Sequence, residues 1–287
     1  MKDALKKLVE FLFNGNASSV DGVTTDILKY NATTSDLVGN IARYAVMPVA
    51  LTVLAIVMMV ELNRKASHIE ADHQTGVKLI AAVIFKYIIL VMAVKNSNML
   101  LIAIRALVST VLNDGNVSGE GVSVNANGEA VSAFQASIDK ASSVDQVGML
   151  IFLLIPFLVT LAAKATLMVV VLLRFAELYM LTAFAPLPFA FLGNDETKAF
   201  GTSYLRKYVE VCIHGVCIVI SIQIYKGVIS AAAGTENRSF LEVSPIGSDD
   251  PLAWLVGNYL PILITPVILM MVVLGSGKIA KAIAGNS

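Results

Sequence analysis

The chain has 287 residues, of which 56% are hydrophobic and only 15% are charged. Soluble domains of this size carry about a quarter charged residues, so the composition excludes an ordinary soluble globular protein. The formal net charge is zero, which provides no overall field to attract nucleic acid or another charged partner.

The first 40 residues precede the long apolar runs. In them Leu5, Leu8, Val9 and Leu12 are spaced as on one face of a short amphipathic helix. We expect this helix to lie on a membrane surface or on a partner, within an extracytoplasmic segment at 1–40.

Two apolar runs follow within 41–112, and each approaches the ~20 residues that a helix needs to cross a bilayer. The first predicted span covers about 41–62, and the second covers about 77–94 with Lys86 near its middle. Residues 99–112 are apolar again, and they either continue the second helix beyond the membrane or lie along its surface.

A polar segment rich in Gly, Asn, Ser and Asp covers 113–146 and is predicted to be an extracytoplasmic loop. The core membrane domain follows at 147–287, and it starts with an apolar stretch at 147–192 that is long for one span. This stretch forms either one span plus a membrane-associated half-helix or a tight hairpin of two spans. Further spans are predicted at about 208–230 and 252–274.

The charges of the connecting segments decide between these alternatives. The segments at 63–78 and 193–207 and the C-terminal tail are basic, whereas those at 113–146 and 231–251 are net acidic. Because cytoplasmic loops are enriched in Lys and Arg, the basic segments are assigned to the cytoplasm. The stretch at 147–192 then crosses once. The fold class is therefore an all-α membrane bundle of about five spans, with the N-terminus outside and the C-terminus in the cytoplasm.

The sequence Ala-Pro-Leu-Pro at 185–188 interrupts the long apolar stretch. Each proline removes a backbone donor, so a proline-broken element is predicted near 185–192. Such a break at membrane depth persists only where protein or a water-filled cavity covers the freed backbone groups. Pro186 and Pro188 are therefore candidates for shaping a packed interface or the wall of a pathway.

Several charged side chains fall within predicted spans, where they usually face a bundle interior or an aqueous cavity. Arg174 and Glu177 are three residues apart and are predicted to pair on one helix face. This pair either orients the helix or serves as a gate or a subunit contact. The flexible side chains of Lys164 and Lys86 can extend so that their ammonium groups reach the membrane–water interface. For Lys86, which lies in the middle of its span, a buried partner such as Glu177 is expected.

A polar stripe follows one face of the predicted penultimate span, because its members recur at steps of three and four. They are Lys207, Glu210, His214, Cys217, Ser221 and Tyr225. The stripe either makes hydrogen bonds between helices or lines a pore or proton relay, and Glu210 and His214 are its candidate functional residues.

The sequence indicates no catalytic triad, metal-ligand motif or dinucleotide motif, so neither enzymatic activity nor a cofactor or metal is expected. Gly-Ser-Gly-Lys at 275–278 departs from the phosphate-loop pattern. Val272 stands where the first glycine is needed, and Ile279 replaces the Ser or Thr after the lysine.

Four elements between Arg174 and Tyr225 form a recognisable order. They are Arg174-Phe-Ala-Glu177-Leu-Tyr179, Ala185-Pro186-Leu187-Pro188-Phe-Ala190, a polar turn at 193–196, and GTSYLRKY at 201–208 leading to His214-Gly215. This stretch resembles the polytopic membrane subunit of type IV secretion and conjugation machines, the TrbL-like (VirB-six-like) family.

The resemblance implies a non-enzymatic, homo-oligomeric component of the bacterial cytoplasmic membrane. Such subunits sit in the lipid bilayer, contact other channel subunits and their ATPases, and help DNA or protein to cross, with transient contact to that cargo. It further implies that Arg174 and Glu177 orient subunits and that Pro186 and Pro188 shape the broken element. The alternatives are a secondary transporter or small-solute channel, which also has broken helices and buried charges, and a membrane anchor for an extracellular assembly.

Overall fold

The computed structural model describes residues 2–14, 31–66, 73–114, 138, 142–232, 251–257 and 259–285. Every regular element in these ranges is a helix. Four helices are long and apolar enough to cross a membrane, or five if one bent helix pair counts as a span. This confirms the predicted all-α polytopic bundle of about five spans. The predicted loop at 113–146 lies mostly outside the described residues.

The chain divides into two compact units. Unit 1 comprises residues 1–25, 115–173 and 217–279, and unit 2 comprises residues 26–114, 174–216 and 280–287. Two long helices, α9 (Ser143–Ala183) and α11 (Lys198–Ala232), contribute residues to both units.

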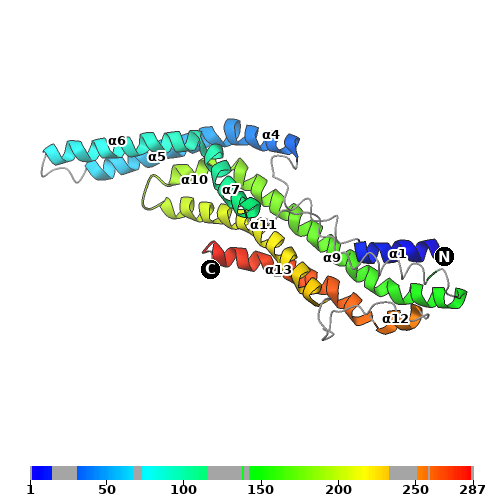
Figure 1. Ribbon diagram of the computed structural model, residues 1–287. Coiled ribbons are helices and arrows are strands. Elements are labelled where there is room, and N and C mark those ends of the chain that lie inside the picture. Colours follow the sequence, from blue (N-terminus) through cyan, green and yellow to red (C-terminus); the bar gives the residue numbers. More distant parts are fainter. Residues whose placement is uncertain are drawn as a thin grey trace. The chain divides into compact units, whose positions relative to one another are not determined.

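In unit 1, the N-terminal helix α1 (Lys2–Asn14) packs beside α9 (Figure 1). Its apolar face joins a core that α9, α12 (Pro251–Gly257) and α13 (Tyr259–Ile283) complete. The buried members of this core are Leu5, Val9, Leu12, Ile138, Met149, Leu153, Leu255 and Ile262. The amphipathic helix was therefore predicted correctly, but its apolar face covers the chain's own core and not a membrane surface or a partner.

Unit 2 begins with one long candidate span, Ala32–Ala66, made of α4 (Ala32–Asn40), the π-helical turn η1 (Ile41–Val46) and α5 (Met47–Ala66). The wider turn has a cause in the sequence. Pro48 lacks an N–H, and its ring would clash with the carbonyl of residue 44 in a regular helix. In η1 the N–H of Met47 bonds instead to the carbonyl of Ala42, five residues back.

Helix α6 (His73–Lys95) runs back along α5, and the short helix α10 (Pro186–Phe191) packs against both (Figure 1). Helix α7 (Ser97–Asp114) then turns away from α6 by 72°. Residues 99–112 therefore do not continue the second helix in line, which removes one of the two predicted arrangements.

Helix α9 is continuous over 41 residues even though it contains Pro156. At about 1.5 Å per residue it is roughly 60 Å long, about twice the ~30 Å of a bilayer's hydrocarbon core. The hairpin alternative for 147–192 is therefore wrong: one long helix is followed by the short, proline-started α10. The next helix, α11, begins at Lys198 and not near 208, because the preceding polar segment is helical as well.

Candidate functional site at the proline-broken element

At the break between α9 and α10, two carbonyls of the last turn of α9 receive donors that replace the regular helical ones. The Ala185 N–H donates to the carbonyl of Thr182 over 3.2 Å, three residues back. Thr182 thereby gains the donor that Pro186 cannot supply. The carbonyl of Leu181, which Ala185 would serve in a regular helix, accepts instead from the hydroxyl of Tyr204 on α11. One backbone donor, the Ala185 N–H, and one side-chain donor, the Tyr204 hydroxyl, thus satisfy these two carbonyls at the break.

Helix α10 starts with Pro186 in its first turn, where a missing N–H is tolerated. Pro186, Pro188, Phe189 and Ala190 are buried. The core that encloses the helix contains Ala50, Leu54, Val83, Tyr87, Val94, Phe189 and Ala190. The broken element therefore lies in a packed interface with α5 and α6, which is one of the two surroundings predicted for it.

The start of α11 contacts the backbone of α10 because residue 201 is a glycine. A Cβ on Gly201 would lie 2.6 Å from the carbonyl oxygen of Pro188 and 2.7 Å from Cδ2 of Leu192. Carbon atoms do not approach a carbonyl this closely, so any side chain at residue 201 would push α11 away from α10.

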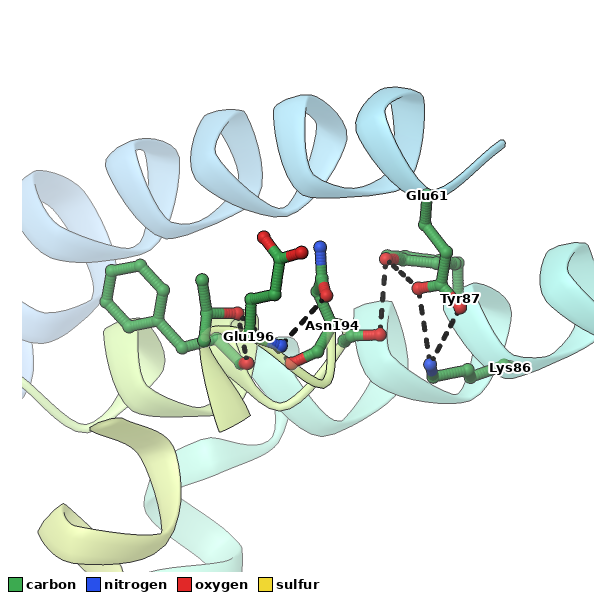
Figure 2. Close-up of polar contacts among 8 residues, drawn as sticks. Glu61, Lys86, Tyr87, Asn194 and Glu196 are labelled. Atoms are coloured by element: carbon green, nitrogen blue, oxygen red, sulfur yellow. Dashed lines mark hydrogen bonds and ion pairs between the residues drawn. The ribbon is translucent and has the colours of Figure 1, made fainter. Parts of the chain in front are cut away.

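The turn between α10 and α11 satisfies its own polar groups (Figure 2). The N–H of Glu196 donates to Oδ1 of the buried Asn194 over 3.0 Å. Thr197 Oγ1 donates to the carbonyl of Phe191 over 2.7 Å, and the Lys198 N–H donates to the carbonyl of Asn194 over 2.8 Å. These bonds lower the cost of holding the turn against an apolar surface, because they pair several of its backbone groups.

Three side chains of the α5–α6 hairpin form a hydrogen-bonded cluster that reaches this turn through Tyr87, and we call them the Glu61 network. Glu61 on α5 accepts from Lys86 Nζ over 3.1 and 3.2 Å and from the Tyr87 hydroxyl over 2.7 Å (Figure 2). The same hydroxyl lies 3.3 Å from the carbonyl of Gly193 in the turn. The predicted pairing of Lys86 with Glu177 is wrong, because the antiparallel packing of α5 on α6 places Glu61 opposite Lys86.

A second contact joins the same two segments on the surface. Arg64 Nη1 lies 2.9 Å from Oε1 of Glu196, and these side chains are 60% and 70% exposed. The end of α5 and the turn before α11 are therefore neighbours in space, although more than a hundred residues separate them in sequence.

Arg174 and Glu177 lie on neighbouring faces of α9 but have different surroundings. Arg174 belongs to the buried side with Phe175 and Leu178, and its guanidinium rests against Gly215 of α11. Glu177 is exposed and, in the described part of the chain, forms no ion pair with Arg174. Three residues turn a helix by about 300°, so the two side chains are offset by about 60°. Helix α11 packs against the face of α9 that carries Arg174. The Arg174 guanidinium therefore lies against Gly215, and the ion pair with Glu177 that the sequence predicts is not formed.

The remaining predicted residues are in separate places. In unit 1, Lys164 Nζ lies 3.6 Å from the ring centre of Phe11. In unit 2, Glu210 pairs with Lys207 over 2.8 Å, and the half-buried His214 interacts electrostatically with both and with Arg174. Within unit 2, Lys86 pairs with Glu61 and the Arg174 guanidinium lies against Gly215, so these two charges have different neighbours.

The site residues that were not predicted include Glu61, Tyr87, Gly201 and Tyr204. A signal for Glu61 was present, because Glu61 and Lys86 carry opposite charges in adjacent predicted spans. Gly201 lies against the backbone of α10, and Tyr204 donates to a backbone carbonyl of α9. A single sequence contains no pattern that predicts such contacts between helices.

The long apolar helices define a multi-pass membrane protein. A family model described as TrbL/VirB6 plasmid conjugal transfer like protein matches residues 16–186, which is more than half of the chain. The chain belongs to this family and is thus a component of conjugal transfer, the type IV secretion class of machine. The match ends at the first proline of α10, and so it overlaps the predicted motif stretch, 174–225, only at its beginning. Neither a search of curated proteins nor a search of solved structures found a match.

Proposed function

We propose that this chain is a non-enzymatic, oligomeric scaffold or channel subunit that helps DNA or protein to cross the bacterial cytoplasmic membrane. In this proposal the segments 1–40 and 113–146 are outside and the C-terminus is in the cytoplasm. Its partners are other channel subunits, the energising ATPases and further copies of the chain, in the lipid bilayer, with transient contact to the transferred cargo.

The observation that carries the proposal is the attachment of the α10–α11 turn to the α5–α6 hairpin. Glu61 holds Lys86 and Tyr87, and Arg64 reaches Glu196. Arg64 and Glu196 belong to the basic stretches at 63–78 and 193–207, both of which the charge pattern assigns to the cytoplasm. Their contact supports a common cytoplasmic side, where a fixed surface is available to partner subunits.

The closed state of the break favours a scaffold over a secondary transporter. Transporters use discontinuous helices to present unpaired backbone ends to a substrate or ion. Here the carbonyls around Pro186 are occupied by Ala185 and Tyr204, and the turn is closed by Asn194 and Thr197. A break at which the carbonyls of Leu181 and Thr182 are paired within the chain supports helix packing more directly than solute binding.

The test is the frequency of DNA transfer from a donor that lacks this gene. Wild-type complementation is expected to restore transfer. A Glu61→Gln/Tyr87→Phe variant is expected to insert at normal levels but to restore transfer poorly, because the turn loses its contact with the Tyr87 hydroxyl. Arg64→Gln is the matched control, since its ion pair is exposed, and it is expected to complement like wild type.

Two results would count against the proposal. Undiminished transfer from the clean deletion would exclude a role in conjugation. Solute-dependent thermal stabilisation of the purified protein would then become the next experiment, because a ligand that binds only the folded state raises its apparent stability. Full complementation by the double variant would leave the secretion role intact but would show that the Glu61 network does not support it.

A further inference from the structure

The α5–α6 hairpin has one end at which no loop joins its two helices. Because α6 runs back along α5 (Figure 1), this end consists of the turn η1, which precedes α5, and the last turn of α6. Ala50 near the start of α5 and Val94 near the end of α6 belong to the same buried core. Arg43, Tyr44 and Lys95 therefore lie at one end of the hairpin, which we call the open end.

The side chains of these three residues are exposed, and Tyr44 is 73% exposed. In the described part of the chain, neither the Arg43 guanidinium nor the Lys95 ammonium forms an ion pair. The acidic residue of α4, Asp36, lies about two helical turns, or roughly 10 Å, before Arg43. The two positive charges are therefore available to a negatively charged group from outside the chain.

The open end borders an exposed apolar surface. Exposed apolar side chains along the hairpin include Val49, Ile56, Met59, Ile84, Phe85, Ile88, Ile89 and Met92. The chain itself buries only 17% of the most apolar part of the span Ala32–Ala66, which leaves the remainder to the acyl chains of lipids.

The length of the first helix of the hairpin places the open end at the edge of the membrane. The segment from Arg43 to Arg64, near the end of α5, is roughly 30 Å long at about 1.5 Å per residue. This length matches the hydrocarbon core of a bilayer. When Arg64 lies among the head groups of one leaflet, Arg43 therefore lies among those of the other.

This position favours lipid phosphates as the partner. An arginine beside hydrocarbon is costly unless its charge is compensated, and its N–H groups form strong charge-assisted hydrogen bonds with phosphate. Tyrosine is enriched at the level of the head groups, which is where Tyr44 lies. Two cations at one end of the hairpin favour a head group with a net negative charge over a zwitterionic one, which brings a cation of its own.

We propose that the open end of the α5–α6 hairpin binds the phosphates of anionic phospholipids such as phosphatidylglycerol. Arg43 donates hydrogen bonds to a phosphate, Lys95 adds a second positive charge, and Tyr44 lies among the head groups. The bound lipid fixes the depth of the hairpin in the bilayer. In the orientation proposed above, the lipid belongs to the extracytoplasmic leaflet, but its binding does not depend on the secretion role of the protein.

The experiment is native mass spectrometry of the purified full-length protein, titrated with phosphatidylglycerol or with phosphatidylcholine of the same acyl chains. The variants are Arg43→Gln, Lys95→Gln and the two combined. The charge-conserving control is Arg43→Lys/Lys95→Arg. A second control, Lys198→Gln/Arg206→Gln, removes two exposed positive charges from α11. Thermal unfolding of each variant without added lipid shows that it is folded, and the single variants test the proposal even where the double variant does not fold.

Wild type is expected to bind phosphatidylglycerol more tightly than phosphatidylcholine. Each single variant is expected to weaken phosphatidylglycerol binding about fivefold and the double variant about twentyfold, since each basic residue near an anionic surface contributes a similar share. Both controls are expected to stay within about twofold of wild type, as is usual for surface changes.

Equal binding of the two lipids, or equal phosphatidylglycerol binding by wild type and the double variant, would overturn the proposal. An equal loss in the α11 control would also overturn it, because net charge alone would then explain the binding. Loss of an oligomer in the double variant, with unchanged lipid binding, would overturn the proposal and assign the open end to a contact with a second copy of the chain.

Discussion

The guanidinium of Arg174 occupies the space in which a side chain on Gly215 would lie. A Cβ at residue 215 would be 2.0 Å from Cζ of Arg174 and 2.1 Å from Nη2. The glycine in α11 therefore provides the room for a charged side chain of α9 in the packed interior of unit 2. Arg174 functions here as a packing group between two helices, and its position depends on the absence of a neighbouring Cβ.

Gly215→Ala is expected to destabilise the protein, because the added methyl group collides with the Arg174 guanidinium. Overpacking of this kind costs about 1–3 kcal/mol. Gly275→Ala is the control, since a Cβ at residue 275 meets nothing within 4 Å and alanine favours a helix by up to about 1 kcal/mol over glycine. Thermal unfolding in detergent should rank Gly275→Ala above Gly215→Ala. Equal melting temperatures would contradict the close contact.

Gly201→Ala is expected to cost more than Gly215→Ala. The atom nearest to its new methyl group is the backbone carbonyl of Pro188, whereas the guanidinium of Arg174 is the end of a flexible side chain. A backbone cannot move without displacing the whole of α10, so the loss is expected at or above the upper end of about 1–3 kcal/mol. The same unfolding series measures it. A variant at residue 201 as stable as wild type would show that α11 does not contact α10 in this way.

Much of the fold could be predicted because its signals are local. Apolar run length marks the spans, and the two prolines at 186 and 188 mark the end of α9 and the start of α10. The short apolar stripe from Leu5 to Leu12 marks α1. The surroundings of α1 could not be predicted in this way. An apolar helix face indicates that it is buried, but not which surface buries it.

The candidate site was less accessible to prediction, because its contacts join distant segments. Lys86 was recognised as needing a partner, but Glu61 can be chosen over Glu177 only once α5 is known to pack on α6. The spacing of Arg174 and Glu177 permits a pair, and the packing of α11 on one side of α9 prevents it. Residues such as Tyr204, which serves a carbonyl of another helix, carry no signal in composition or periodicity.

Tyr204→Phe is expected to lower stability because it removes the donor to the Leu181 carbonyl beside the helix break. A buried carbonyl without a partner costs about 1–3 kcal/mol. Tyr44→Phe is the matched control, since the Tyr44 side chain is 73% exposed, and its effect is expected within about 0.5 kcal/mol. Thermal unfolding of the two variants compares them directly. Indistinguishable losses would show that the freed carbonyl has another donor.

Glu61→Gln is expected to destabilise the protein much more than Arg64→Gln, although each change breaks one ion pair of α5. The Glu61 side chain is only 13% exposed and serves both Lys86 and Tyr87, and hydrogen bonds to a charged group contribute about 1.5–3 kcal/mol. The Arg64 and Glu196 side chains are mostly exposed, and such pairs contribute at most about 1 kcal/mol.

A double-mutant cycle between Glu61→Gln and Tyr87→Phe tests whether these residues act together. A coupling energy above about 0.5 kcal/mol is expected for side chains in one hydrogen-bonded network. Additive losses would mean that the contact between Glu61 and Tyr87 contributes nothing measurable to the stability of the hairpin.

Single cysteines at Ala66 and Asp195 are expected to label from the same side of the membrane. Arg64 and Glu196, next to these positions, are 2.9 Å apart, and residues in direct contact cannot lie on opposite faces of a bilayer. In a variant that lacks Cys212 and Cys217, a membrane-impermeant maleimide should leave both positions unlabelled in intact cells and should label both in inverted vesicles. A cysteine at Lys2 is the counterpart and is expected to label in intact cells if the N-terminus is outside.

Opposite labelling of residues 66 and 195 would contradict the packing of the α10–α11 turn on the α5–α6 hairpin. Labelling of both in intact cells would preserve that packing and reverse the proposed orientation.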